Sequence, residues 1–350
     1  MNYSEPDSTY IRGRGAQINP ANRFHQHVHD PEPQDRDART QYINVYPKSM
    51  LNRVTSPDIG MAWSMNPYQG CEHGCIYCYA RNTHNYWGYS AGLDFEQKIL
   101  VKKDAPKVLE AELRKKSWKP EPIMLSGNTD CYQPIERELE ITRQVLEVLW
   151  KYRHPVGIIT KNSLILRDLD ILKQMAEHRL VRASVSLTTL DEGLRRTLEP
   201  RTASVHSRLK TIQTLAENGI PVNVMLAPII PGLNDHEILS MAETVSRLGA
   251  LSVAYTMVRL NGDVAEIFED WIRKNLPDRA ERVLNRIRDC HGGQLNDHRF
   301  GARMRGEGKV AEIVAQQFKL AKQLYFQGKA KPEYNLELFE QFRNPQLSLF

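Results

Sequence analysis

The sequence has no long apolar run, and this absence argues against a membrane-spanning protein. None of its hydrophobic stretches approaches the roughly 18–20 residues that a membrane-spanning helix needs. The first fifteen residues, MNYSEPDSTYIRGRG, are polar and lack the apolar centre of a signal peptide. We therefore expect a cytoplasmic protein.

Cysteine is scarce as well, with five in 350 residues. An odd number with three members clustered argues against the disulfide framework of a secreted domain. The paired C-x2-C spacing of most structural zinc sites is also missing, because Cys131 and Cys290 stand alone. In a reducing compartment, the remaining cluster indicates metal or redox chemistry.

Neither charge sign dominates the chain. The 47 Lys and Arg against 42 Asp and Glu give a net charge of +5 with His neutral. This mild excess is compatible with a nucleic-acid partner without establishing one, since the placement of charge matters more than its sum. The chain is long enough for one large α/β domain with extensions.

The first 45 residues contain few large aliphatic side chains and many Asp, Arg, His, Pro and Gln. Such a segment buries too little apolar surface to offset the entropy of ordering, so we expect a disordered polar arm over 1–45. Within it, His25, His27 and His29 alternate along the chain. They are candidate metal ligands or simply part of an exposed tail.

From about residue 58 onwards, short apolar runs alternate with longer amphipathic stretches. This alternation is typical of parallel strands joined by helical crossovers. We predict a partial (β/α)6 TIM-like barrel over 58–260, although a doubly wound sheet fits nearly as well. A helical extension is expected over 261–328 and a flexible tail over 329–350. The predicted strands are 61–66, 98–101, 122–127, 156–160, 182–189, 222–230 and 252–258.

Polar segments follow the carboxyl ends of these predicted strands. They are the cysteine loop, SGNTD (126–130), TKNS (160–163), SLTT (186–189) and APIIPG (227–232). Ligands of open and closed β/α folds bind at this end of the strands, so we expect the segments to meet at one mouth.

The cysteine loop, GCEHGCIYCY, spaces Cys71, Cys75 and Cys78 as C-x3-C-x2-C. Zinc would need a fourth ligand, and His73 lies in a cramped position between two of the cysteines. A cubane [4Fe–4S] cluster is bound by thiolates. Three cysteines would hold three of its corners and leave one iron free for another molecule.

This loop, placed after the first strand of a β/α domain, resembles that of the radical S-adenosylmethionine (SAM) superfamily. The resemblance implies a [4Fe–4S] cluster on the three cysteines, with SAM chelating the free iron. It also implies contacts to SAM from the mouth, although the family's usual Gly-Gly-Glu is absent. The implied contacts are Ser126, Gly127, Asn128 and Thr129 to the amino group, Tyr77 near the adenine, and Ile229 and Ile230 at the adenine, where plain strand core is the alternative.

Tyr77 and Tyr79, which flank Cys78 in CIYCYA, are similar to the spore photoproduct lyase family of DNA-repair enzymes. That resemblance implies that Lys161 pairs with the SAM carboxylate and that Ser186 lies near its ribose or carboxylate. Arg201 is a rival for the carboxylate, because arginine binds carboxylates bidentately.

The chain departs from the lyase pattern at the hydrogen donor. The lyase has a cysteine three residues before the Asp that corresponds to Asp130, but this chain has Gly127 there and Cys131 after the Asp. Cys131 is a candidate donor or a buried thiol, and Tyr79 is a candidate relay or a packing residue. The longer string SPDIGMAWSMNPYQGCEHGCIYCYAR resembles more closely a bacterial family of photolyase-like radical SAM proteins without an established substrate.

The last residues, QLSLF, resemble the short peptide by which bacterial repair proteins bind the DNA polymerase sliding clamp. Leu347, Leu349 and Phe350 form an apolar set, of which Leu349 and Phe350 would fill a hydrophobic pocket, with Gln346 hydrogen-bonded beside it. A docked or disordered chain end is the alternative.

The sequence therefore predicts a radical SAM enzyme that needs an external electron donor and acts on nucleic acid, with DNA repair as its role. Modification of RNA or protein is the rival activity. A non-catalytic metal-binding module that docks on the clamp or on nucleic acid is the rival from another class.

Overall fold

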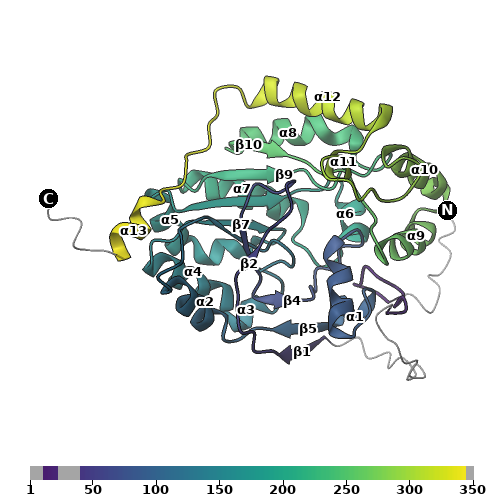
Figure 1. Ribbon diagram of the computed structural model, residues 1–350. Coiled ribbons are helices and arrows are strands. Elements are labelled where there is room, and N and C mark those ends of the chain that lie inside the picture. The colour runs from purple at the N-terminus through teal and green to yellow at the C-terminus, as the bar shows by residue number, and fades with distance from the viewer. Residues whose placement is uncertain (1–10, 23–39, 344–350) are drawn as a thin grey trace.

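The computed structural model describes residues 11–22 and 40–343 (Figure 1). Its centre is an open seven-stranded sheet in the order β10-β9-β8-β7-β6-β3-β2. Neighbouring strands from β3 to β10 run parallel, and only β2 pairs antiparallel. The partial barrel with six parallel strands is thus confirmed. The strands are β2 (Asn52–Arg53), β3 (Trp63–Met65), β6 (Ile123–Leu125), β7 (Val156–Thr160), β8 (Val181–Ser186), β9 (Val222–Met225) and β10 (Ser252–Ala254).

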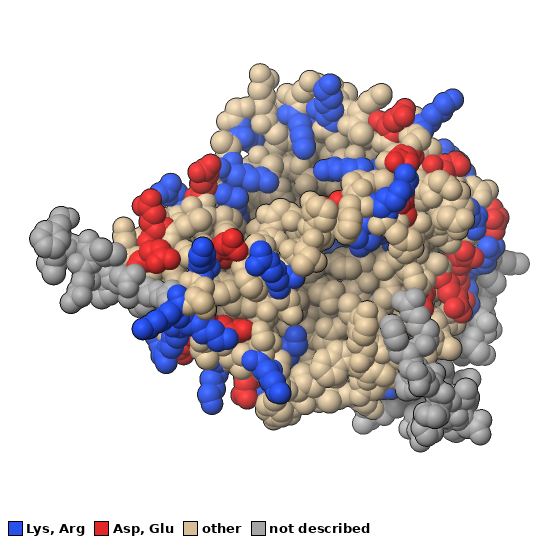
Figure 2. Space-filling model, viewed as in Figure 1, with Lys and Arg blue, Asp and Glu red and all other residues tan. Residues whose placement is uncertain are grey.

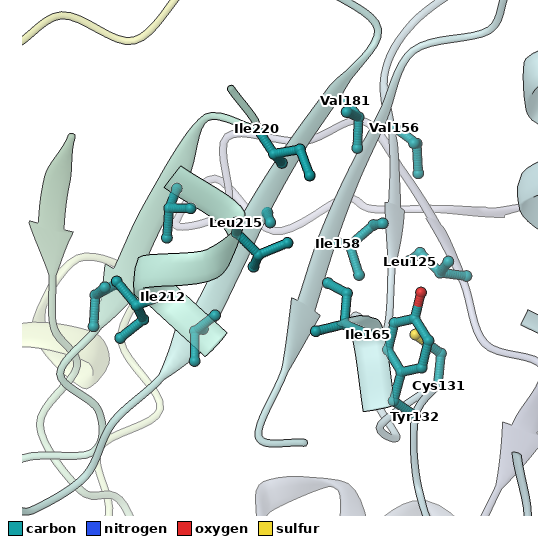
Figure 3. Packing of buried hydrophobic residues seen from close by; sticks show 14 of the residues in the cluster. Leu125, Cys131, Tyr132, Val156, Ile158, Ile165, Val181, Ile212, Leu215 and Ile220 are labelled. Carbon is teal, nitrogen blue, oxygen red and sulfur yellow. The ribbon is translucent and has the colours of Figure 1, made fainter. Parts of the chain in front are cut away.

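Helices cover the outer face of this sheet, as Figure 1 shows. Outward-facing residues such as Ile158 and Val224 are fully buried. Figure 3 shows Ile158 in the same core as Ile212 and Leu215 of α7. This packing explains the apolar periodicity of both strands and helices. The helices up to the last strand are α1 (Leu93–Gln97), α2 (Ala105–Leu113), α3 (Glu136–Leu139), α4 (Ile141–Lys151), α5 (Leu169–Glu177), α6 (Glu192–Leu198), α7 (Val205–Glu217) and α8 (Ile238–Arg247), with 3₁₀ helices η1 (Tyr79–Trp87), η2 (Ser163–Asp168) and η3 (Asp235–Glu237).

The predicted strand at 98–101 forms, but in a different sheet. It is β5 (Lys98–Val101), which pairs with β1 (Gln41–Asn44) and β4 (Tyr68–Gln69) in a separate three-stranded sheet. Alternation along the chain does not reveal this, because any strand followed by a helix resembles a crossover unit. The cysteine loop begins directly after β4 of this small sheet.

The C-terminal extension continues further than predicted. The expectation of a flexible tail from residue 329 is wrong for 329–343. Tyr334 Oη donates to the Val156 carbonyl at 3.3 Å, and the Arg182 guanidinium lies 4.0 Å from the Tyr334 ring centroid. This segment therefore closes the amino-terminal end of the sheet's inner face. The helices of the extension are α9 (Val264–Asn275), η4 (Pro277–Arg279), α10 (Ala280–Cys290), α11 (Ala302–Arg305), α12 (Gly308–Tyr325) and α13 (Glu337–Arg343).

The N-terminal expectation also needs correction. Residues 14–16 are buried, and the Glu96 carboxylate accepts hydrogen bonds from the backbone N–H groups of Gly15 and Ala16 at 3.0 and 2.7 Å. The predicted disordered arm over 1–45 is thus wrong for 11–22 and for strand β1. Few aliphatic residues are needed to order this segment, because its backbone N–H groups bind the buried Glu96 carboxylate. The three alternating histidines at 25, 27 and 29 lie outside the described residues.

Gly15 fixes this segment against the cysteine loop. A Cβ atom built on Gly15 would lie 1.8 Å from the Gly74 carbonyl oxygen, a distance that no side chain tolerates. The close approach explains why glycine stands at this position.

We expect Gly15→Ala to lower the free energy of unfolding by about 1–3 kcal/mol, because the added methyl group forces two backbones apart. Urea denaturation measures the change. Gly60→Ala is the matched control, since a Cβ at Gly60 meets nothing within 4 Å. Equal stability of the two variants would contradict the close packing of 14–16 on the loop.

Within the described part of the chain, no helix is both long and apolar enough to cross a membrane.

Candidate active site

The cysteine loop is held in place by backbone hydrogen bonds to two helices, α1 and α6. The N–H of Cys71 donates to the Phe95 carbonyl at 2.9 Å, and the N–H of Ile76 donates to the Leu198 carbonyl at 3.0 Å. The loop then enters η1 directly after Cys78. Its shape is therefore set by β4, by α1 and by the end of α6.

The three thiols lie close together and largely out of water. Cys71 and Cys75 are buried, Cys78 is half-buried, and none of the three is in a disulfide. Burial raises the pKa of Cys75 and of Cys78, and the negative charge of the neighbouring thiolates raises both further. The positive charge of Lys161 opposes this rise in the pKa of both cysteines. Its Nζ lies 5.9 Å from the ring centroid of Tyr77, the residue before Cys78.

His73 does not serve as a fourth ligand in this arrangement. Its Nδ1 lies 3.4 Å from the Asp130 carboxylate and its Nε2 lies 3.2 Å from the Asn162 amide, so both ring nitrogens are engaged. Among the described residues, no three His, Cys, Asp or Glu side chains are placed as the ligands of a single metal ion.

Asp130 ties the cysteine loop to the mouth of the barrel. Besides His73, its carboxylate accepts hydrogen bonds from Thr160 Oγ1 and from the Lys161 N–H, both at 2.8 Å. Because Thr160 is the last residue of β7 and Lys161 follows it, one carboxylate sets the position of Lys161 relative to the cysteine loop. Polar segments after neighbouring strands do meet here, as expected.

The 126–129 segment lies beside the cysteine loop. Ser126 has a φ of 72°, an uncommon conformation for a residue with a side chain, and its Oγ accepts a hydrogen bond from the Cys131 N–H at 2.8 Å. The Asn66 side chain accepts from the N–H groups of Asn128 and Thr129. Tyr79 Oη donates to the Gly127 carbonyl, which joins this segment to the residue after Cys78.

A buried cluster beneath Tyr77 was not found from the sequence. The Glu199 carboxylate pairs with the Arg208 guanidinium and accepts hydrogen bonds from Tyr77 Oη and from Thr188 Oγ1. Burial alone would raise the Glu199 pKa, but Arg208, Lys161 and these hydrogen bonds lower it to about 2. Arg208 sits on the apolar face of α7 with Val205 and Ile212. The sequence signal that could have revealed this buried group is a charged residue, Arg208, at a core position of a predicted helix.

The other residues predicted to contact SAM lie in different surroundings. Ser186 ends β8 and is buried, and its carbonyl accepts from Arg208 at 3.1 Å. Ile229 packs in the main core, whereas Ile230 packs in the cluster that also holds Cys75 and Tyr77. Arg201 forms an ion pair with Glu72 at 3.1 Å and lines a surface cavity with Arg12 and Arg14.

The two candidate catalytic residues differ in their surroundings. Cys131 is fully buried in the core with Leu125 and Ile165, as the alternative of a buried thiol expects (Figure 3). Tyr79 is 45% exposed, with its ring 5.8 Å from the Arg259 guanidinium. Their predicted roles as donor and relay stay predictions.

Three clustered thiols at the carboxyl ends of an open β/α barrel define a barrel enzyme that holds an iron–sulfur cluster at its mouth. The sequence model of the radical SAM superfamily matches residues 65–245, and the chain belongs to this superfamily. Its enzymes use a [4Fe–4S] cluster and SAM.

Individual relatives agree. An uncharacterized protein of Mycobacterium tuberculosis is 32% identical over 238 residues, covering 67% of this chain and 70% of that protein. An uncharacterized protein of Methanocaldococcus jannaschii is 27% identical over 250 residues, covering 71% and 89%. Spore photoproduct lyase complexed with dinucleoside spore photoproduct shares the fold, with a TM-score of 0.62, 14% identity and coverage of 82% and 80%.

The residues present fit these cofactors. Cys71, Cys75 and Cys78 supply three soft sulfur ligands from one loop, and their burial in apolar surroundings shields a cluster from water. Lys161 lies at the same mouth, with its N–H bound to Asp130 and its Nζ 5.9 Å from the Tyr77 ring centroid, as an anchor for a carboxylate would.

Proposed function

We propose that this radical SAM enzyme acts on a nucleic acid and that DNA is its substrate, with repair of a damaged base as its role. The likeness to spore photoproduct lyase, a structure holding a dinucleoside lesion, carries the proposal. The mouth supports it, because an exposed tyrosine beside an arginine, Tyr79 and Arg259, is a pairing typical of single-stranded nucleic-acid sites.

The cluster and SAM, when bound, supply a 5′-deoxyadenosyl radical that abstracts a hydrogen atom from the substrate. The chain's own residues position and protect that chemistry. The three cysteines hold the cluster, and Lys161, Ser186 and the 126–129 segment orient SAM. The Tyr77 hydroxyl is held by Glu199 and Thr188. The Tyr77 side chain thereby separates the thiols from the buried Glu199–Arg208 ion pair.

Figure 2 shows Lys and Arg side chains spread around a hollow in the face that it draws, with mostly uncharged residues in the hollow itself. Cations around an uncharged recess suit a substrate whose phosphates stay outside while a base enters.

The test is a deuterium-transfer screen. Reconstituted full-length protein is reduced in the presence of SAM and of ultraviolet-damaged or intact oligonucleotides that carry deuterium in the base. We expect deuterium in 5′-deoxyadenosine with at least one damaged DNA oligonucleotide. Transfer only from RNA or from peptides would overturn the DNA proposal and favour the rival modification activity.

We expect Lys161→Met to weaken SAM binding by about 10- to 100-fold, because a charge-assisted contact to its carboxylate is lost. Isothermal titration of the reconstituted protein with SAM measures this directly. Lys151→Met, which removes an exposed ammonium group on α4, is the matched control. Unchanged affinity of the Lys161 variant would assign the carboxylate to another residue, with Arg201 the alternative.

The predicted clamp-binding peptide, Gln346, Leu347, Leu349 and Phe350, lies outside the described residues. It stays a proposal from the sequence alone. We expect the full chain, but not a chain ending at residue 345, to be retained on immobilised sliding clamp. Equal retention of the two would remove the clamp as a partner.

A further inference from the structure

The inner face of the main sheet is partly open, in contrast to its outer face. Outward residues such as Ala183, Val224 and Val253 are at most 2% exposed. The residues that alternate with them, such as Ser184 and Asn223, are only partly buried. The inside of a complete TIM barrel is normally filled by layers of side chains. Partial exposure here means that the inner face borders space that solvent can enter.

One row of this face is polar and uncharged. Parallel register places Ser184 beside Asn223, and Asn223 beside Ser252, on β8, β9 and β10. We call these three residues the inner row. With strands about 4.8 Å apart, the row spans about 10 Å. Three polar side chains in register inside a barrel need a partner, because burial without hydrogen bonds is costly.

The inner row is internally ordered but not saturated. Ser252 Oγ donates to Asn223 Oδ1 at 2.5 Å, and Asn223 Nδ2 donates to Ser184 Oγ at 3.4 Å. An amide has two N–H donors and two acceptor lone pairs. One of each is used along the row, so the Asn223 amide keeps one N–H donor and one acceptor lone pair beyond the bonds of the row.

The depth of the row suits a substrate. On β8, Ser184 lies two residues before Ser186 at the mouth, a distance of about 7 Å along a strand. On its other side, Arg182 and Tyr334 close the amino-terminal end of the barrel. The inner row therefore lies between this closed end and the mouth that carries Lys161 and the thiols.

We infer that the inner row reads the hydrogen-bonding edge of a nucleobase that enters the barrel. This rests on the proposed action on DNA and names the residues that select the base. Adjacent donor and acceptor groups of an asparagine match the paired groups on a base edge. The absence of charge from Ser184, Asn223 and Ser252 argues against a phosphate or carboxylate at the row.

The test compares two octanucleotides that differ at one position, thymidine or an abasic site, as binding probes for the reconstituted, SAM-loaded protein. We expect the wild-type chain to prefer the thymidine probe by about tenfold. Asn223→Leu removes the amide at similar volume and should abolish that preference, while its weaker binding to the abasic probe stays unchanged. Gln213→Leu, which removes an exposed amide on α7, is the matched control and should keep the preference.

Formation of 5′-deoxyadenosine without substrate separates the possible failures. Asn223→Leu should form it at the wild-type rate, because the inner row does not touch the SAM contacts. Base preference retained in Asn223→Leu would overturn the inference and leave the proposed function intact. A wild-type chain without preference for the thymidine probe would also overturn the inference, whereas the proposed function is overturned by the deuterium-transfer screen with damaged DNA.

Discussion

Purified Cys78→Ser protein is expected to be colourless and to form no 5′-deoxyadenosine. In the proposed assignment, three sulfur ligands from one loop hold the cluster, and Cys78 is the least buried of the three. A hydroxyl group is a poor substitute for a thiolate at iron. Iron content, the absorbance near 400 nm that is typical of such clusters, and product formation on reduction with SAM measure the loss.

The matched control is Cys290→Ala. Cys290 is also buried, but it lies in the core at the end of α10. Its loss should cost no more than about 1–2 kcal/mol of stability and leave the colour intact. A brown, active Cys78 variant, or a colourless Cys290 variant, would contradict the assignment of the ligands.

Arg208→Met should be among the most destabilising single substitutions in the chain, lowering the free energy of unfolding by about 3–5 kcal/mol. Both partners of the Arg208–Glu199 pair are at most 1% exposed, so the variant leaves an unpaired carboxylate in the core. Because Glu199 also binds Tyr77 and Thr188, the cysteine loop should loosen with it. Urea denaturation and the rate of cluster loss report the two effects.

A double variant, Glu199→Gln with Arg208→Met, isolates the unpaired charge as the cause. It should regain much of the lost stability, because no buried charge remains. Arg196→Met, which breaks an exposed pair with Glu192, should change stability by less than about 1 kcal/mol. A double variant as unstable as Arg208→Met alone would mean that packing, and not charge, is the cause.

The same carboxylate predicts a pH dependence. The folded-state pKa of Glu199 is lowered to about 2, below its ordinary value of 4.5. Its contribution to stability is therefore complete above about pH 4.5 and is lost as the pH falls towards 2. Glu199→Gln should remove this part of the acid sensitivity, which denaturation series between pH 5 and pH 3 would show.

The sequence predicted the fold and the mouth because both depend on local signals. Strand–helix alternation follows from apolar periodicity, and parallel strands bring their carboxyl ends together wherever the chain turns. The cysteine spacing is likewise local. The separate sheet of β5 was missed because strand pairing is decided by contacts far along the chain, such as that between Gln41 and Lys98.

The buried ion pair and the inner row could not be predicted from the sequence either, because their members come together only through contacts far along the chain. Arg208 and Glu199 meet only after α6 and α7 fold back, although an arginine on an apolar helix face signals a buried partner. The inner row needs the register of three strands, and a shift by one residue would turn all three side chains outward. The packed segments at 11–22 and 329–343 bind through backbone and single side chains, which composition does not reveal.

The contact between Gly15 and Gly74 has a consequence for how the protein matures. Residues 14–16 leave the ribosome well before the loop with Cys71, Cys75 and Cys78. Glu96, whose carboxylate anchors residues 14–16, emerges after that loop. They cannot dock until about eighty later residues have emerged. Docking of 14–16 on the cysteine loop is therefore a late step of folding, which waits for the carboxylate on α1.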